Sequence, residues 1–252
     1  MHDAKPMRPN GYRDLRMLCR KTIEFVLTRQ KDDGGFGATP YLPSTVEDTY
    51  YGLSLLDMLK PASDRKEEIS ERIGMSIQYL EGLRPRANWN PKTFYYYLLG
   101  REDFYYLCKA KEQVGLGPPD LKKLDEDKVD FSRWRTAKEL WLKLCVADLC
   151  RNNTTPDRES LISWVIQCQN PDGGFGFYPG TTSFIENCHI CLMILKILNA
   201  APANPIAVRD FILRCRTVRG GFARKNGGAP FLDATWHAIS SLKLLEPLLK
   251  GT

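Results

Sequence analysis

The strongest constraint on the fold is a Gly-Gly-Phe turn that occurs three times at related spacings. The glycine pairs begin at Gly34, Gly173 and Gly220, and the first two copies read Gln-x-x-Asp-Gly-Gly-Phe-Gly. The first two copies lie 139 residues apart and the last two 47 apart, so the longer distance is close to three times the shorter one. Fixed periods of this size are typical of helical repeat proteins.

A second motif follows each turn about a dozen residues later. It consists of an acid, any residue, Thr or Cys, and then a ring side chain, and its copies start at Glu47, Glu186 and Asp233 with the same two spacings. Apolar residues at helical intervals follow each copy. Each repeat therefore reads as a helix, a glycine turn that ends it, and a second helix whose first turn carries an acid, which suits the helix dipole.

These signals predict an all-α chain that forms a single domain over residues 1–252, built from about five helical hairpins. Clear repeats cover 12–60, 157–199 and 203–250, and degenerate repeats fill 61–155. One helix should open near Ser44 or Glu47 and another near Thr182 or Ser183, where the residues favour a helix N-terminus. The latter helix is predicted at 183–198, and the remaining helices at 12–29, 64–83, 91–99, 101–113, 134–151, 157–169, 204–217 and 232–249.

Composition excludes several classes of protein. Hydrophobic residues make up 43% and charged residues 26%, no apolar run is long enough to span a membrane, and the N-terminus lacks the apolar core of a signal peptide. We therefore expect a cytoplasmic protein without a transmembrane segment. The net charge of +6 is spread along the chain, so a nucleic-acid partner is not expected. The eight cysteines read as free thiols, with Cys188-x-x-Cys191 leaving a structural zinc knuckle as a minor alternative.

The middle of the chain is less regular. Aromatic residues crowd the segments 94–97 and 104–106, where they either fill the core or line an apolar pocket. A charged, proline-containing loop from Gly115 to Asp130 is a candidate for a lid, an insertion or a partner contact.

The turn and the helix start that follows it together resemble the prenyltransferase and squalene-oxidase repeat. That repeat builds the α/α toroid of protein prenyltransferase β subunits and of class II terpene cyclases. The resemblance implies a toroid, a ring of hairpins around an apolar cavity that receives an isoprenoid or other lipid-like ligand. The second helix of each hairpin then forms an inner wall whose first turn faces one mouth of the ring.

The resemblance also implies a set of site residues around that mouth. Expected catalytic residues are Tyr50, His189 and Trp236, and expected substrate-binding residues are Glu47, Tyr51, Phe177 and Tyr178. The alternative is that the acids only cap helices and the rings only fill the core.

A zinc ion is implied as well, because prenyltransferase β subunits hold one with an Asp-x-Cys pair and a His from the next repeat. Here the matching residues are Glu186, Cys188 and Asp233, with His237 one turn later as a substitute ligand. The family's two cationic positions before the ligand acid are occupied by Gly180 and Ser183, which cannot neutralise a diphosphate. The familiar toroid has six hairpins and its β subunit has an α-subunit partner, so a ring of five leaves room for a protein partner or a homo-oligomer.

Three functions follow from the resemblance. The first is a prenyltransferase-type enzyme, or a former enzyme of this type, in which zinc-dependent transfer or binding of an isoprenoid-like group takes place. The second is a non-catalytic module that binds a lipid or peptide or serves as a scaffold. The third is a class II terpene cyclase, for which the nearest acidic run, Asp125-Glu126-Asp127, reads as a solvated turn.

Overall fold

The computed structural model describes residues 11–82, 131, 133–149 and 157–250. Within these residues the regular elements are helices apart from two strands of two residues each, which confirms the all-α prediction. The elements are α1 (Gly11–Leu27), α2 (Val46–Leu59), the 3-10 turn η1 (Lys60–Ala62), α3 (Lys66–Gly82), α6 (Ala137–Leu149), α7 (Arg158–Gln167), α8 (Ile185–Ile197), α9 (Pro205–Arg214), the two-residue strands β1 (Phe222–Ala223) and β2 (Pro230–Phe231), and α10 (Leu232–Lys250). The predicted helices 91–99 and 101–113, the aromatic segments 94–97 and 104–106, and the loop Gly115–Asp130 lie outside the described residues.

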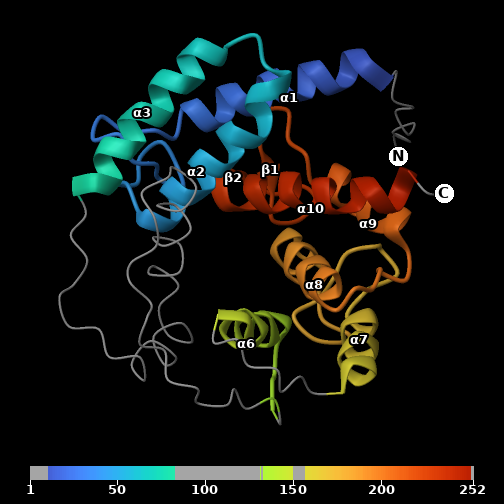
Figure 1. Cartoon of the computed structure of the whole chain (residues 1–252). Coiled ribbons are helices and arrows are strands. Elements are labelled where there is room, and N and C mark those ends of the chain that lie inside the picture. Colours follow the sequence, from blue (N-terminus) through green and yellow to red (C-terminus); the bar gives the residue numbers. More distant parts are fainter. Residues whose placement is uncertain (1–10, 83–130, 132, 150–156, 251–252) are drawn as a thin grey trace.

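The helices form an inner and an outer layer (Figure 1). The inner helices follow one another as neighbours in the order α2, α10, α8 and α6, while α1, α9 and α7 each lie outside their own hairpin partner, and α3 packs on α2. Helix α8 is buried on almost every side of its first two turns, because α10, α6 and α7 all contact it. This is the layering of an α/α toroid, as the repeat predicts.

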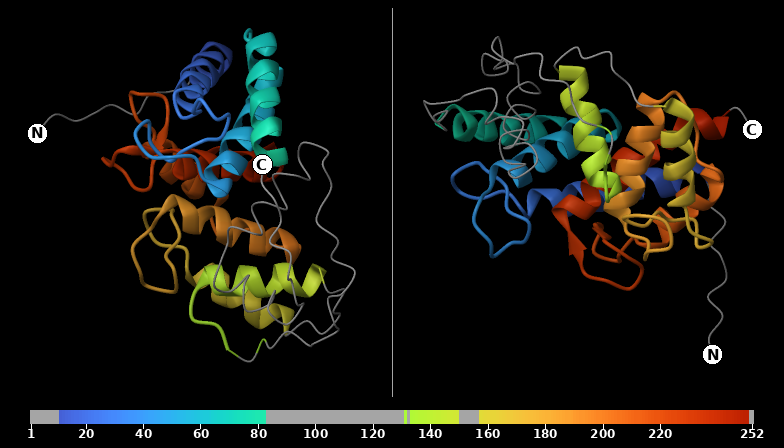
Figure 2. Two further views of the ribbon diagram at one scale, coloured as in Figure 1. Left: turned by 90° about the vertical axis from the view of Figure 1, so that its left-hand side faces the viewer. Right: turned by 90° about the horizontal axis from the view of Figure 1, so that it is seen from below.

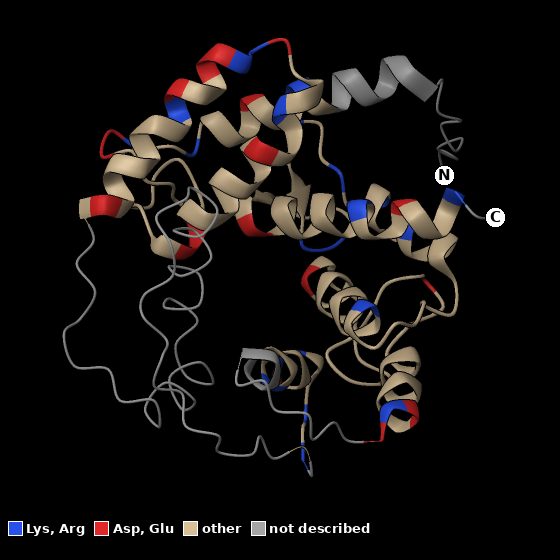
Figure 3. Cartoon of the chain, in the orientation of Figure 1, with Lys and Arg blue, Asp and Glu red and all other residues tan. Residues whose placement is uncertain are grey.

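Charged residues of both signs are distributed over the described helices (Figure 3). The inner helix α8 carries one acid, Glu186, in its first turn and one base, Lys196, in its last turn. The residues between them are uncharged, so the middle of this wall is apolar apart from Asn187 and His189.

The glycine turns adopt one conformation in all three clear repeats. The first glycine of each pair has a positive φ, at 86° for Gly34, 90° for Gly173 and 93° for Gly220, which glycine adopts without strain. The phenylalanine that follows the pair is fully buried in each repeat. All three turns and the loops after them lie on the same face of the molecule (Figure 2).

The turns also join the repeats to one another. A Cβ atom on Gly34 would lie 2.3 Å from the carbonyl oxygen of Met75 in α3, and one on Gly173 would lie 2.2 Å from that of Ala207 in α9. Each turn is thus seated on the outer helix of the next repeat, at a distance that leaves no room for a side chain.

The last turn makes the same contact with the first helix of the chain. A Cβ atom on Gly220 would lie 2.2 Å from the carbonyl oxygen of Lys21 in α1. The Thr22 hydroxyl donates to the Gly220 carbonyl at 2.8 Å, just as the Ser76 hydroxyl donates to the Gly34 carbonyl at 2.7 Å. The last clear repeat therefore contacts the first one directly.

The inner helices begin close to the predicted positions. Helix α2 starts after Thr45, whose side chain accepts a hydrogen bond from the Asp48 N–H, and α8 starts after Phe184, which provides no side-chain cap. Across the described part of the chain, no helix has the length and apolar character needed to cross a membrane.

Candidate functional site

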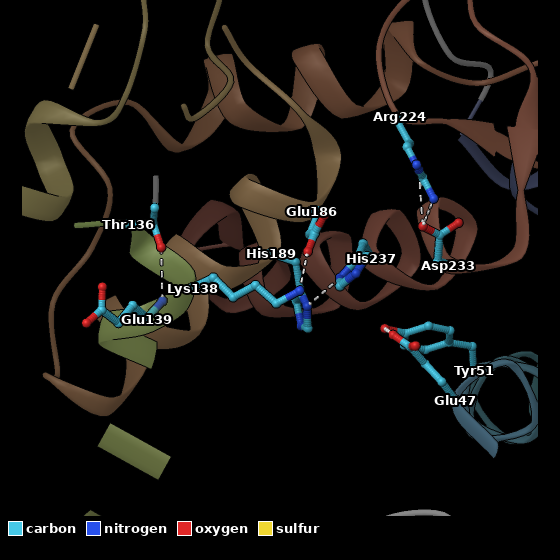
Figure 4. Close-up of polar contacts among 10 residues, drawn as sticks. All are labelled: Glu47, Tyr51, Thr136, Lys138, Glu139, Glu186, His189, Arg224, Asp233 and His237. Atoms are coloured by element: carbon cyan, nitrogen blue, oxygen red, sulfur yellow. Dashed lines mark hydrogen bonds and ion pairs between the residues drawn. The ribbon is translucent and has the colours of Figure 1, made fainter. Parts of the chain in front are cut away.

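The repeated acids occupy the first turns of α2, α8 and α10, and each has a partner (Figure 4). The Glu47 carboxylate accepts a hydrogen bond of 2.9 Å from the Tyr51 hydroxyl. Glu186 pairs with Lys138 of α6 at 3.2 Å, and Asp233 pairs with Arg224 at 2.8 Å. The charge of two of the three acids is therefore balanced by a base from a different element.

Two histidines meet between α8 and α10. The Nδ1 atoms of His189 and His237 lie 3.0 Å apart, so one ring must donate a proton that the other accepts. Burial lowers the pKa of His237 to about 3, and the positive charges of Lys138 and Arg224 act in the same direction. Burial also lowers the pKa of His189 well below its usual value, with His237 as a smaller cause. Both rings are neutral at pH 7.

Trp236 is the centre of an aromatic cluster, which comprises Tyr50, Tyr51, His189, Trp236 and His237. The Trp236 ring lies with its centroid 5.4 Å from that of Tyr50, 4.8 Å from Tyr51, 4.6 Å from His189 and 4.9 Å from His237. Its indole N–H donates to the Ser54 hydroxyl of α2 at 2.8 Å. The cluster thus joins three inner helices, α2, α8 and α10.

Two predicted substrate-binding residues lie elsewhere. Phe177 and Tyr178 sit in the loop before α8, with 39% and 51% of their surfaces exposed. The Phe177 ring faces Phe184, and its carbonyl accepts the N–H of Ala137 at the start of α6. The structure therefore brings Tyr51 into the aromatic cluster and leaves Phe177 and Tyr178 on the loop face.

Cys188 points into the glycine turn of its own repeat. Its sulfur accepts a hydrogen bond of 3.4 Å from the N–H of Phe175. The thiol is completely buried, and burial raises its pKa well above the usual value. A buried, protonated thiol in this position contributes to packing and to the turn.

The four residues that the resemblance implied as zinc ligands are not assembled around one point. Glu186 and Asp233 are engaged with bases, the His237 Nδ1 with His189, and Cys188 with the turn. In the part of the chain that the structure describes, no group of three or more His, Cys, Asp and Glu side chains could hold a metal ion. Cys188 and Cys191 therefore have no further ligands beside them with which to form a zinc knuckle. These residues, as arranged, do not fit a zinc ion, and zinc stays unconfirmed.

Reasoning from the sequence assigned neither Lys138 nor Arg224 to the site. The repeat itself holds a signal for Lys138. Counting 47 residues back from Glu186 reaches Glu139, so the acid position of a degenerate repeat falls beside Lys138. A base next to that position in the first turn of α6 is placed to reach the acid of the neighbouring inner helix.

Comparison with known proteins decides the family. The family model described as the prenyltransferase alpha-alpha toroid domain matches residues 10–91 and 132–251. The chain belongs to this family. The prediction from the glycine turns and the helix starts is confirmed.

The relatives are distant. The beta subunit of geranylgeranyl transferase type 1 from Arabidopsis thaliana is 29% identical over 105 residues, which cover 39% of this chain and 28% of that protein. The structure of Candida albicans protein geranylgeranyltransferase-I complexed with GGPP aligns over 90% of this chain and 91% of that chain, with 13% identity and a TM-score of 0.38.

Proposed function

We propose that this chain is a prenyltransferase-type toroid that accommodates an isoprenoid-like apolar group against the aromatic cluster of its inner helices. Membership of the family and the likeness to the Arabidopsis relative, a geranylgeranyl transferase subunit, support an isoprenoid rather than another ligand. The observation that carries the proposal is the convergence of four rings from α2, α8 and α10 on Trp236.

The chemistry of the cluster suits an uncharged, branched hydrocarbon. Aromatic rings supply large apolar faces at low cost in side-chain entropy. The two imidazoles remain neutral, so they add no charge to the cluster. Tyr50 is only partly buried, whereas the other four rings are buried, so we expect Tyr50 to be the ring that a ligand meets first.

Binding and transfer are separable parts of the proposal. Binding of the apolar group needs only this chain. The Arabidopsis relative is one subunit of a transferase. For the transfer step we therefore propose that this chain acts together with a second protein subunit. Because the residues matched to the zinc ligands do not fit a metal, the proposal does not include zinc.

Energy transfer from tryptophan to a dansyl-labelled geranylgeranyl diphosphate analogue tests the proposal. We expect saturable transfer in the full chain, and about tenfold weaker binding in Trp236→Leu, which corresponds to about 1.4 kcal/mol of lost contact. The matched control is Trp164→Leu, because Trp164 lies on the outer helix α7, edge-on to Trp134. The proposal fails if no saturable transfer occurs, or if both variants weaken binding equally.

A further inference from the structure

We infer that the contact between the third glycine turn and the first helix is a binding site for a free oxyanion of the phosphate type, held by Arg29, Arg219 and the Gly221 N–H. The site lies beside the outer helix α1, whereas the aromatic cluster lies on the inner helices. The inference therefore does not depend on isoprenoid binding, and each can fail without the other.

The first two glycine turns each contain a carboxylate of their own. Asp33 accepts the N–H of Gly35 at 2.9 Å and the hydroxyl of Ser44 at 2.7 Å. Asp172 makes the same two bonds in its repeat, with the N–H of Gly174 at 2.9 Å and with the serine hydroxyl 11 residues later at 2.8 Å. In both turns an anionic group thus satisfies the backbone donor of the second glycine.

The third turn lacks this carboxylate. The same spacing places Arg219 at the position of the aspartate and Pro230 at that of the serine. Gly221 is buried, and no acceptor within the described residues takes its N–H. Since a buried N–H without an acceptor is costly, an anion at the position of the missing carboxylate would stabilise this turn.

A buried base approaches the same turn from the first repeat. Arg29 stands where the other two clear repeats have the buried Cys168 and Cys215, and only 8% of its surface is exposed. Its Nη1 atom donates to the Thr28 hydroxyl at 2.9 Å, but its Nε atom is buried without a partner. No carboxylate in the described part of the chain forms an ion pair with it. A buried charge in this state requires a counter-charge.

The Phe25 ring of α1 brings these groups together. The Arg29 guanidinium carbon lies 4.2 Å from the centroid of this ring, and a Cβ atom on Gly221 would lie 2.7 Å from its Cζ atom. Burial lowers the pKa of Arg29, and the positive charge of Arg219 lowers it further, so the two bases are close enough to repel each other. An anion between them would remove this repulsion.

The donors fit phosphate better than a carboxylate. A guanidinium group binds oxyanions through paired, charge-assisted hydrogen bonds. Two such groups and one backbone N–H supply more positive charge and more donors than a singly charged carboxylate can use. Arg219 is exposed, so its side chain is free to close over an anion that reaches the turn from solvent.

Replacing Arg219 with the residue of the other two turns tests the inference. In Arg219→Asp the chain supplies its own carboxylate, and in Arg29→Met the buried base is removed. The matched control is Lys66→Asp, which makes the same change of charge at an exposed position in the first turn of α3. Phosphate binding to each full chain is measured by calorimetric titration. Urea unfolding is recorded in phosphate and in sodium chloride of equal ionic strength.

We expect the wild type and Lys66→Asp to bind one phosphate with a Kd of about 1 mM. Phosphate at about 10 mM should then favour the folded state about tenfold. Arg219→Asp and Arg29→Met should lose both the binding and this response. In phosphate-free buffer Arg219→Asp should unfold at a higher urea concentration than the wild type, because its own carboxylate accepts the Gly221 N–H.

An equal response to phosphate in all four proteins would be the general stabilising effect of this salt and would overturn the inference. The absence of a response in the wild type would overturn it too. An equal response of the wild type to acetate would overturn the assignment to phosphate. If Arg219→Asp does not fold, the comparison between wild type, Arg29→Met and Lys66→Asp still decides.

Discussion

The contact between the last glycine turn and the first helix is tested by adding one methyl group to Gly220. The residue has a φ of 93°, and an added Cβ would lie 2.2 Å from the Lys21 carbonyl oxygen. Backbone strain in this region costs about 1–3 kcal/mol for a residue other than glycine. Displacing the turn from α1 adds a packing cost of about 1–3 kcal/mol and weakens the bond from Thr22 to the Gly220 carbonyl. We therefore expect Gly220→Ala to lower the free energy of unfolding by about 2–6 kcal/mol.

The matched control is Gly227→Ala. Gly227 has a similar positive φ of 78°, but nothing lies within 4 Å of the position that its Cβ atom would take, so the control bears the strain without the contact. Urea unfolding followed by circular dichroism should show Gly220→Ala to be less stable than Gly227→Ala by about 1–3 kcal/mol. In thermal unfolding the Tm of Gly220→Ala should be lower by about 2–4 °C for each kcal/mol of this difference. Equal losses in the two variants would refute the seating of the last turn on α1.

Two further predictions concern the inner helices. Because the pKa of His237 falls from 6.5 to about 3 on folding, the unfolded chain binds the proton first, and stability is lost as pH drops below 6.5. Between pH 7 and 5 this one residue should lower the free energy of unfolding by about 2 kcal/mol. Urea unfolding of His237→Asn should therefore show a fall in stability over this pH range that is smaller by that amount than in the wild type. An equal fall in the two proteins would contradict a neutral, buried ring. Among the described residues, neither amide atom of Asn187 has a hydrogen-bond partner, although the side chain is buried. Asn187→Leu should therefore raise the free energy of unfolding by about 1 kcal/mol, measured as a higher urea midpoint. A lower midpoint would show that the Asn187 amide has hydrogen-bond partners in the folded protein.

The sequence predicted the parts of the fold that depend on local signals repeated at a fixed distance. The glycine pairs located the turns, because only glycine adopts their positive φ beside a neighbouring backbone. The acids located the starts of α2, α8 and α10 to within two residues. The contact between the Gly220 turn and Lys21 was not predictable, since it joins residues far apart in the sequence and follows from the packing of repeats against one another.

The site was predicted less completely, because its contacts link different helices. Period and resemblance selected Tyr50, His189, Trp236 and His237, which do come together. They could not indicate that the Trp236 indole donates to Ser54, which lies outside the repeated motif. The period does lead to the position beside Lys138, but it does not show that this side chain reaches Glu186.

The role of Cys188 shows how one pattern supports two readings. The resemblance to prenyltransferase β subunits implied a metal ligand at this position. The sequence of the chain itself places Thr49 and Thr235 at the equivalent positions. Only the structure shows what these side chains share, which is a hydrogen bond to the backbone of the preceding turn.

The central claim is that the aromatic cluster of the inner helices accommodates an isoprenoid-like group without a metal. Native mass spectrometry of the full chain, mixed with geranylgeranyl diphosphate in a buffer that contains EDTA, tests this claim most directly. We expect a complex of one chain with one isoprenoid and no metal. A complex that forms only after zinc is restored, or no complex under either condition, would contradict the claim.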